Sequence, residues 1–321
     1  MNVAFFIYRR PDLTARVFEA IAAARPERLL IVADGPKDEA DRERCEPTRA
    51  IVERVDWPCD VRRDYAPANL GCKRRVASGL AWVFGQVEEA VILEDDCLPH
   101  PTFFPFCAEL LERFRKDKRV GHIAGNNLLP DPGAACSYSF SRHPRIWGWA
   151  SWRRAWREYD VDMRAWPDLR DRGGVRPLCQ TDAEARYFLD AWEDLYRGRV
   201  DTWDGQWNFA QRLHGRLTVV PAVNLVANIG FRADATHTTD HRLPYAAVPA
   251  AAMAFPMRHP LSVAADAAAD QRFVELVYPL HRPWTQRLWW RLTNKHWYGR
   301  WLRRLPLAGR LWARLRSRRR P

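Results

Sequence analysis

The sequence predicts an α/β fold in which a mostly parallel central sheet is flanked by helices. Apolar runs alternate with segments of helical spacing along residues 1–124. Strands that alternate with helices in this way build parallel sheets that are covered on both faces. The run from Ala90 to Leu93 is apolar throughout, as buried parallel strands are. Three carboxylates follow it, and such sheets bind ligands outside the carboxyl ends of their strands.

Strands and helices are expected to alternate along the first part of the chain. The predicted strands cover residues 3–8, 29–33, 61–65, 91–93 and 120–124, and the predicted helices cover residues 11–24, 40–55, 69–86 and 103–115. Pro11 suits the first turn of its helix, because the fixed φ of proline is already helical. Asp34-Gly35-Pro36 is a strong turn signal after the second strand.

The second part of the chain is aromatic-rich and less regular. A helix is expected over residues 182–197, and short strands over 217–220 and 224–227. Residues 243–270 are rich in Ala and Pro, which favours a linker or a loosely packed arm. The predicted organisation is an α/β domain of residues 1–242, a linker or packing arm of residues 243–281, and a basic helical extension of residues 282–321.

The net charge of +12 belongs to one segment. Thirteen of the 51 Lys and Arg lie in residues 282–321, which hold no Asp or Glu, so the rest of the chain is nearly neutral.

The seven Cys show no zinc spacing and are odd in number, which favours free thiols in a reducing compartment. The first apolar run is too short for a signal peptide, and no apolar stretch reaches the roughly 20 residues that span a bilayer.

The acidic triplet Glu94-Asp95-Asp96 is the strongest candidate site. Carboxylates crowded at a strand end repel one another, so folding alone would not favour them there. A divalent cation would relieve the repulsion, because Mg²⁺ and Mn²⁺ prefer oxygen ligands and often bridge a carboxylate to substrate phosphates. The alternative is a solvated acidic turn.

Other short motifs accompany the triplet in a fixed order. They are Arg9-Arg10-Pro11, Ala33-Asp34-Gly35, Asn69-Leu70-Gly71, Leu93 to Asp96, Pro99 to Phe104, Trp147 to Trp152, Trp203 to Trp207 and Ala235 to Thr238. Together they resemble the nucleotide-sugar-dependent glycosyltransferases of the GT-A fold, with the nearest likenesses in glycosyltransferase family 2 and the N-acetylglucosaminyltransferase I family. The resemblance covers about residues 2–240 and depends on the order of the motifs.

This resemblance implies transfer of a sugar from a nucleotide-diphosphate-sugar donor to an acceptor hydroxyl. By the family pattern Asp96 would ligate Mn²⁺ or Mg²⁺, while Asp95 and Glu94 would contact ribose, sugar or metal-bound water. Glu94 fits equally well as a hydrogen-bond acceptor behind the metal ligands. His237 matches a position where several GT-A enzymes place a metal ligand, and neutral imidazole can complete a Mn²⁺ shell. A surface position for His237 is the alternative.

The same pattern assigns nucleotide-sugar contacts to five further residues. Asp34 would accept a hydrogen bond from the base, although it also suits a turn that bonds its own backbone. Arg10 would lie near base or phosphate. Asn69 would lie near the donor or cap the following helix, and Lys73 would face phosphate or solvent. Trp149 is expected to line the sugar or acceptor pocket.

Asp204 is the candidate general base. Trp203 and Trp207 flank it in the sequence, and partial desolvation by two indoles would raise the pKa of its carboxyl and strengthen it as a base. One direct displacement would invert the anomeric centre. The alternative is that Asp204 caps a helix over residues 205–213, which would leave a retaining mechanism open, with Asp201 as the fallback base.

The basic tail is a second, independent signal. Leucines one turn apart and six Trp are interspersed with its arginines, as in basic amphipathic helices that lie in anionic membrane interfaces. We therefore expect a cytoplasmic protein at the inner face of the membrane that acts on a glycan or lipid-linked acceptor. Nucleic acid is the disfavoured partner, because no recognised motif for it is present. A non-catalytic nucleotide-sugar-binding protein and an adaptor acting through the tail are the other candidates.

Overall fold

The computed structural model describes residues 1–231, 248–278 and 280. The elements of the first part are β1 (Asn2–Ile7), α1 (Pro11–Ala24), β2 (Arg28–Ala33), α2 (Glu39–Ile51), β3 (Asp60–Tyr65), α3 (Cys72–Gln86), β4 (Glu89–Glu94), β5 (Cys97–Pro99), α4 (Phe103–Arg113) and β6 (Val120–Ala124). They follow the predicted alternation closely. The helix predicted over residues 40–55 ends earlier, at Ile51. The next residue, Val52, is its C-cap, and its side chain is buried.

The second part adds β7 (Tyr138–Ser141), β8 (Trp149–Trp152), α5 (Arg153–Trp156), α6 (Trp166–Asp171), η1 (Arg176–Leu178), α7 (Asp182–Tyr196), α8 (Asp204–Leu213), β9 (Leu217–Pro221), β10 (Val226–Asn228) and α9 (Ala267–Val277). Helix α9 begins inside the segment that was expected to be a linker or arm. The predicted extension of residues 282–321 lies outside the described residues.

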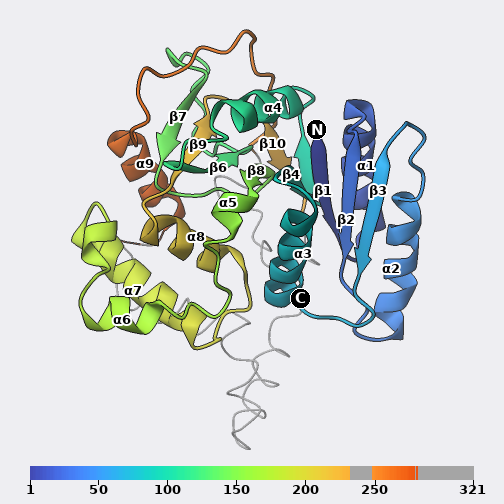
Figure 1. The fold of residues 1–321 in the computed structure, drawn as a ribbon, viewed down its shortest axis with the longest axis horizontal. Coiled ribbons are helices and arrows are strands. Elements are labelled where there is room, and N and C mark those ends of the chain that lie inside the picture. Colours follow the sequence, from blue (N-terminus) through green and yellow to red (C-terminus); the bar gives the residue numbers. More distant parts are fainter. Residues whose placement is uncertain (232–247, 279, 281–321) are drawn as a thin grey trace, which may run out of the picture. The chain divides into compact units, whose positions relative to one another are not determined.

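An eight-stranded sheet has the strand order β3-β2-β1-β4-β8-β6-β9-β7 (Figure 1). Strands β1 to β4 are mutually parallel, and β6 pairs in parallel with β9. Strand β8 is antiparallel between β4 and β6, and β7 is antiparallel to β9. The predicted α/β fold class, with a mostly parallel sheet flanked by helices, is confirmed.

Each face of the sheet carries its own core, because strand side chains alternate between the two faces. Phe5 and Ile31 face the side that is covered by α1, α2 and α4. Phe6 and Val32 face the side that is covered by α3, α5 and α8. These parallel strands are therefore buried on both faces, which explains their continuous apolar runs.

The chain after the acidic triplet leaves the main sheet. Strand β5 pairs antiparallel with β10 in a separate two-stranded sheet, with Pro99 opposite Val226. Proline lacks the amide hydrogen that a central strand must donate, so it suits such an edge. The backbone amide of Ile229 also donates to the carbonyl of Asp96, at 2.8 Å. Residues 226–230 are thereby held beside the triplet.

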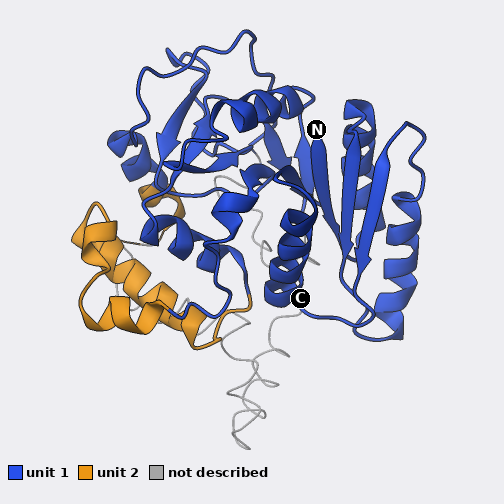
Figure 2. Ribbon diagram, in the orientation of Figure 1, with its two compact units in different colours: residues 1–164, 202–273 blue, residues 165–201, 274–321 orange. Residues whose placement is uncertain are grey.

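The chain divides into two compact units (Figure 2). Unit 1 comprises residues 1–164 and 202–273 and contains the sheet. Unit 2 comprises residues 165–201 and 274–321, of which 279 and 281–321 are outside the described part. In unit 2, Trp166 packs edge-on against Trp192 and donates its indole N–H to Glu193 at 2.9 Å. Within the described residues, no helix combines the length and apolarity that crossing a membrane requires.

Candidate functional site at the strand ends

The parallel register of β1 and β4 brings the Arg-Arg-Pro motif to the acidic triplet. Phe6 of β1 is the register partner of Glu94, the last residue of β4. Both strands point the same way, so the residues that follow them leave the sheet at the same edge. Arg10 comes four residues after Phe6, in the turn before α1, where Pro11 opens the helix. The two motifs, 85 residues apart in sequence, therefore meet at one edge.

Arg10 forms ion pairs with two carboxylates of the triplet. Its Nη2 pairs with Oδ1 of Asp95, and its Nε lies 3.3 Å from the Oδ2 of the same residue. Its Nη1 lies 2.9 Å from Oδ2 of Asp96. Both aspartates are buried, whereas the Arg10 side chain keeps 19% of its surface exposed. One guanidinium thus bridges two adjacent carboxylates, a geometry that its rigid fork allows.

Within the described residues Glu94 forms no such ion pair, and its pKa is raised further than that of Asp95. Burial, followed by the charges of Asp96 and Asp95, raises the pKa of Glu94 to about 8, against a lowering effect of Arg10. The charge of Asp204 raises the pKa of Glu94 further, so Asp204 belongs to the same electrostatic cluster. Burial likewise raises the pKa of Asp95 to about 6 despite its ion pair with Arg10. Glu94 and Asp95 therefore hold protons more readily than isolated carboxyls do.

The triplet does not fit a ready-made metal centre. Within residues 1–231, 248–278 and 280, no three His, Cys, Asp or Glu side chains are grouped as a metal would need. Both oxygens of Asp95 and one oxygen of Asp96 are occupied by Arg10. The backbone at Gly230 also crowds Asp96, since a Cβ there would lie 2.8 Å from the Cγ of the aspartate. Arg10 thus pairs with three of the four carboxylate oxygens of the two aspartates.

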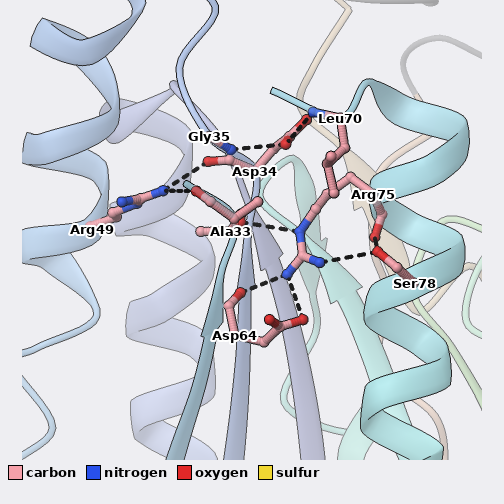
Figure 3. A network of polar contacts seen from close by, with 9 residues as sticks. Ala33, Asp34, Gly35, Arg49, Asp64, Leu70, Arg75 and Ser78 are labelled. Atoms are coloured by element: carbon pink, nitrogen blue, oxygen red, sulfur yellow. Dashed lines mark hydrogen bonds and ion pairs between the residues drawn. The ribbon is translucent and has the colours of Figure 1, made fainter. Parts of the chain in front are cut away.

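Asp34, at the end of β2, has a different set of partners (Figure 3). Its Oδ1 accepts hydrogen bonds from the amides of Gly35 and Leu70, at 2.8 and 2.9 Å. Its Oδ2 accepts from the Asn69 side chain at 2.9 Å and from the amide of Gly71 at 3.2 Å. Asn69 therefore ties two loops together instead of capping α3, whose N-cap is Gly71. Burial raises the pKa of Asp34, while the three amides oppose that rise.

Two arginines that the sequence did not single out complete this network (Figure 3). Arg75 is buried and donates to the carbonyls of Ala33 and Asp64, at 3.1 and 2.6 Å. Arg49 donates to the carbonyls of Asp34 and Ala66, at 3.0 and 3.2 Å. These guanidinium groups thus tie the carboxyl ends of β2 and β3 and the loops that follow them to α2 and α3. No sequence pattern marks either arginine, because each lies on a helix among other basic residues.

Asp204 is the first residue of α8 and is half-buried. Its carboxylate accepts a hydrogen bond from the hydroxyl of Thr202, and it makes no capping bond to the helix backbone. The cap alternative is thus not what the structure has. Trp203 and Trp207 flank it as predicted, but both indoles are buried in the core and present no face to solvent.

Trp149 lies wholly inside the protein. Its side chain is 0% exposed, and it stacks on Trp203 and on His122, with ring centroids 5.6 and 4.9 Å apart. Burial lowers the pKa of His122 to about 3, so that ring is neutral, and its Nδ1 accepts from Trp207 at 3.1 Å. An indole without exposed surface has nothing with which to contact a sugar, so Trp149 is a core residue and not the pocket residue that the sequence predicted.

The two remaining predicted residues are less informative. Lys73, in the first turn of α3, is half-buried and makes no hydrogen bond or ion pair to the described part of the chain. His237 lies outside the described residues. The structure therefore brings Arg10 together with Glu94, Asp95 and Asp96, adds Asp204 electrostatically, and places Asp34 with Asn69 in a separate network one strand away.

Comparisons with known proteins were made with both sequence and structure. No family model and no curated protein matches the sequence. Among solved structures, a Pyrobaculum calidifontis mannosyltransferase in complex with GDP-Man and Mn²⁺ is 14% identical, with 48% of this chain and 44% of that chain covered and a TM-score of 0.35. S. aureus TarS is 9% identical, with 70% and 59% covered and a TM-score of 0.41.

An active-site variant of LgtC is 13% identical, with 89% of this chain and 99% of that chain covered and a TM-score of 0.35. This chain spans less than two thirds of the mannosyltransferase and of TarS. Identities of 9 to 14% and TM-scores of 0.35 to 0.41 are too low to assign any of these proteins' activities to this chain.

Proposed function

We propose that this protein is a glycosyltransferase that moves a sugar from a nucleotide-diphosphate donor to an acceptor hydroxyl. The observation that supports it most is the meeting of Arg10 with the acidic triplet at the ends of β1 and β4. Two buried aspartates share one guanidinium there and a half-buried glutamate lies next to them in the chain, an arrangement that stability alone does not favour. Excess charge of this kind at a strand end is typical of a binding site.

The strand order suggests how the donor would lie. Neighbouring strands β2, β1 and β4 end in the Asp34 network, in Arg10 and in the triplet, respectively. The base of the nucleotide would lie over the end of β2, and the diphosphate beside Arg10, whose fork suits phosphate oxygens. The sugar would then lie toward Glu94 and Asp204. We expect Lys73, on α3, to contribute charge on the phosphate side.

Asp204 is our candidate for the base that takes the proton of the acceptor hydroxyl. It is half-buried, and its electrostatic effect on Glu94 places it in the acidic cluster. A carboxylate base in contact with the acceptor would lead to direct displacement and to inversion of the anomeric centre. Mn²⁺ or Mg²⁺ with Asp96 and His237 as ligands remains a prediction from the sequence, and no step above depends on it.

The test is turnover of a panel of nucleotide sugars by the full chain. We expect one donor to raise the melting temperature, because a ligand selective for the folded state stabilises it. The same donor should be hydrolysed slowly in the absence of an acceptor. Asp204→Asn should keep the thermal shift and lose about 10²-fold or more of the transfer rate. A thermal shift without turnover would favour the alternative, a non-catalytic nucleotide-sugar-binding protein.

The acceptor and the membrane are proposed from the sequence of residues 282–321 alone. Its Trp and Arg pattern suits an anionic bilayer surface, which would place a glycan or lipid-linked acceptor at the inner face of a membrane. We expect the full chain to sediment with anionic vesicles and a chain ending at residue 281 to stay in solution. Equal sedimentation of the two chains would contradict this, and binding to RNA alone would favour the adaptor alternative.

A further inference from the structure

The acidic triplet already has a cation, and that cation is part of the chain. Among the described residues, Arg10 is the only Lys or Arg that forms an ion pair with Asp95 or Asp96. Its charge also lowers the pKa of Glu94, against the effects of burial and of the neighbouring carboxylates. Removing this charge would leave buried carboxylates facing one another, which is strongly unfavourable. Arg10 therefore holds the triplet together in the ligand-free protein.

We propose that Arg10 occupies the position a divalent ion would need, so that an ion binds the triplet only when Arg10 leaves it. The overlap is direct, because Arg10 uses Oδ1 and Oδ2 of Asp95 and Oδ2 of Asp96. Two cations cannot share the same lone pairs in a buried site without strong repulsion. This inference deepens the proposed function, on which it rests for the identity of the donor.

The side chain of Arg10 is placed so that it can move. Its backbone is anchored, because its carbonyl accepts the amide of Thr14 at 2.9 Å and Pro11 follows it. Its side chain is partly exposed and makes no capping bond to α1. Rotation about its long stem would therefore free the carboxylates without disturbing the helix. The natural destination is the diphosphate of a donor, whose oxygens match the guanidinium fork.

Exchange of partners would couple donor and ion. A diphosphate that attracts Arg10 uncovers Asp95 and Asp96, and an ion that binds the two aspartates releases Arg10 toward the diphosphate. Each ligand then raises the affinity for the other by the same factor, as linkage requires. The ion alone would bind the ligand-free protein weakly.

The neighbouring arginine provides a matched control. Arg9 also forms an ion pair with a buried aspartate, but its partner is Asp41 of α2, which also accepts the Tyr8 hydroxyl. Arg9 and Arg10 are thus adjacent in the sequence and both pair with buried aspartates, but only Arg10 pairs with the triplet. Arg9→Gln should therefore leave ion binding at the triplet unchanged.

The experiment measures Mn²⁺ binding to the full chain without any donor, by the electron paramagnetic resonance of free Mn²⁺. We expect Arg10→Gln to bind Mn²⁺ about tenfold more tightly than wild type, a change of about 1.4 kcal/mol. Arg9→Gln should match wild type. Adding Asp96→Asn to Arg10→Gln should remove the gained affinity, which assigns the ion to the triplet. Equal affinities of wild type and Arg10→Gln, or no binding to folded Arg10→Gln, would overturn the proposal.

A second measurement on the wild-type chain covers the case in which Arg10→Gln does not fold. Mg²⁺ is titrated with a fixed concentration of UDP, and the side-chain Nε–H signals of the arginines are followed by NMR. The Arg10 signal, identified by its loss in Arg10→Lys, should shift with Mg²⁺ while the Arg9 signal does not. An unmoved Arg10 signal at saturating Mg²⁺ contradicts the exchange. Ion competition without turnover of any nucleotide sugar would refute the proposed function alone, and turnover without competition would refute this inference alone.

Discussion

Asp34 and the acidic triplet lie at the ends of two strands of one sheet, and they are stabilised in opposite ways. The Asp34 carboxylate accepts four hydrogen bonds, three from backbone amides and one from Asn69. The triplet relies on the guanidinium of Arg10. Asp34 and Asp96 are similarly buried, with 7% and 9% of their surfaces exposed. Equal burial of two acids therefore does not imply equal roles.

The difference favours a structural role for Asp34 and a binding role for the triplet. A carboxylate with all its acceptor positions filled by fixed neutral donors has little left to offer a ligand. A group of carboxylates with a single mobile counter-ion gains by meeting a ligand that changes the local charge. On this comparison Asp34 holds the loops after β2 and before α3 in place, and the triplet is where we propose that the diphosphate end of the donor binds.

The largest effect is expected for Asp96→Asn. Hydrolysis of the nucleotide-sugar donor should fall about 10²- to 10³-fold, because Asp96 is the residue expected to hold a divalent ion, and that ion would stabilise the negative charge on the leaving diphosphate. The melting temperature should hold or rise, since one of three mutually repelling carboxylates has been neutralised. Rates and thermal unfolding are measured on the same preparation. An Asp96→Asn variant that loses stability but keeps its turnover would mean that the triplet, like Asp34, has a structural role.

Asp34→Ala should do the opposite and reduce stability. Its loss leaves the amides of Gly35, Leu70 and Gly71 without this acceptor, which costs about 2–4 kcal/mol of the free energy of unfolding. Urea unfolding measures this. Asp38→Ala is the control, because Asp38 caps α2 through a single bond to the Asp41 amide, and about 1 kcal/mol is expected. An Asp34→Ala effect no larger than the control would remove the distinction.

The pH dependence of stability should trace to Glu94. Its pKa is about 8 in the folded chain against 4.5 ordinarily, so the folded state keeps a proton that the unfolded state releases in between. The free energy of unfolding therefore falls as the pH rises from 4.5 to about 8. In Glu94→Gln the melting temperature should fall less over this pH range than in wild type, by about 2–4 °C. Thermal scans in EDTA measure it, and parallel curves for the two proteins would contradict the assignment.

Arg49→Lys should have the smallest effect. Arg49 donates from Nη2 to two backbone carbonyls near Asp34 and makes no ion pair with that carboxylate. Lysine cannot reproduce the planar fork, so about 1 kcal/mol of stability should be lost. Donor binding should be unchanged in a thermal-shift titration. A loss of donor affinity would mean that the Asp34 network contacts the nucleotide directly.

The elements of the sheet could be predicted because they are local. The helix of residues 11–24 and the strand of residues 120–124 appear with the predicted bounds. Burial of a strand on both faces needs an unbroken apolar run, and a helix start is marked by its proline, so both leave signals within a few residues. The sequence likewise placed Asp34 and the acidic triplet at the ends of strands, where the structure has them.

The partners of those residues were decided by tertiary structure. The sequence placed an arginine before α1 and three acids after β4, but only the β1–β4 register brings Arg10 onto Asp95 and Asp96, across 85 residues. It marked Trp149 as a pocket residue, whereas antiparallel pairing of β8 with β4 and β6 places that indole inside the core. Local patterns determine strands and helices, and the pairing of strands determines which charges meet, because electrostatic contacts depend on distance in space and not along the chain.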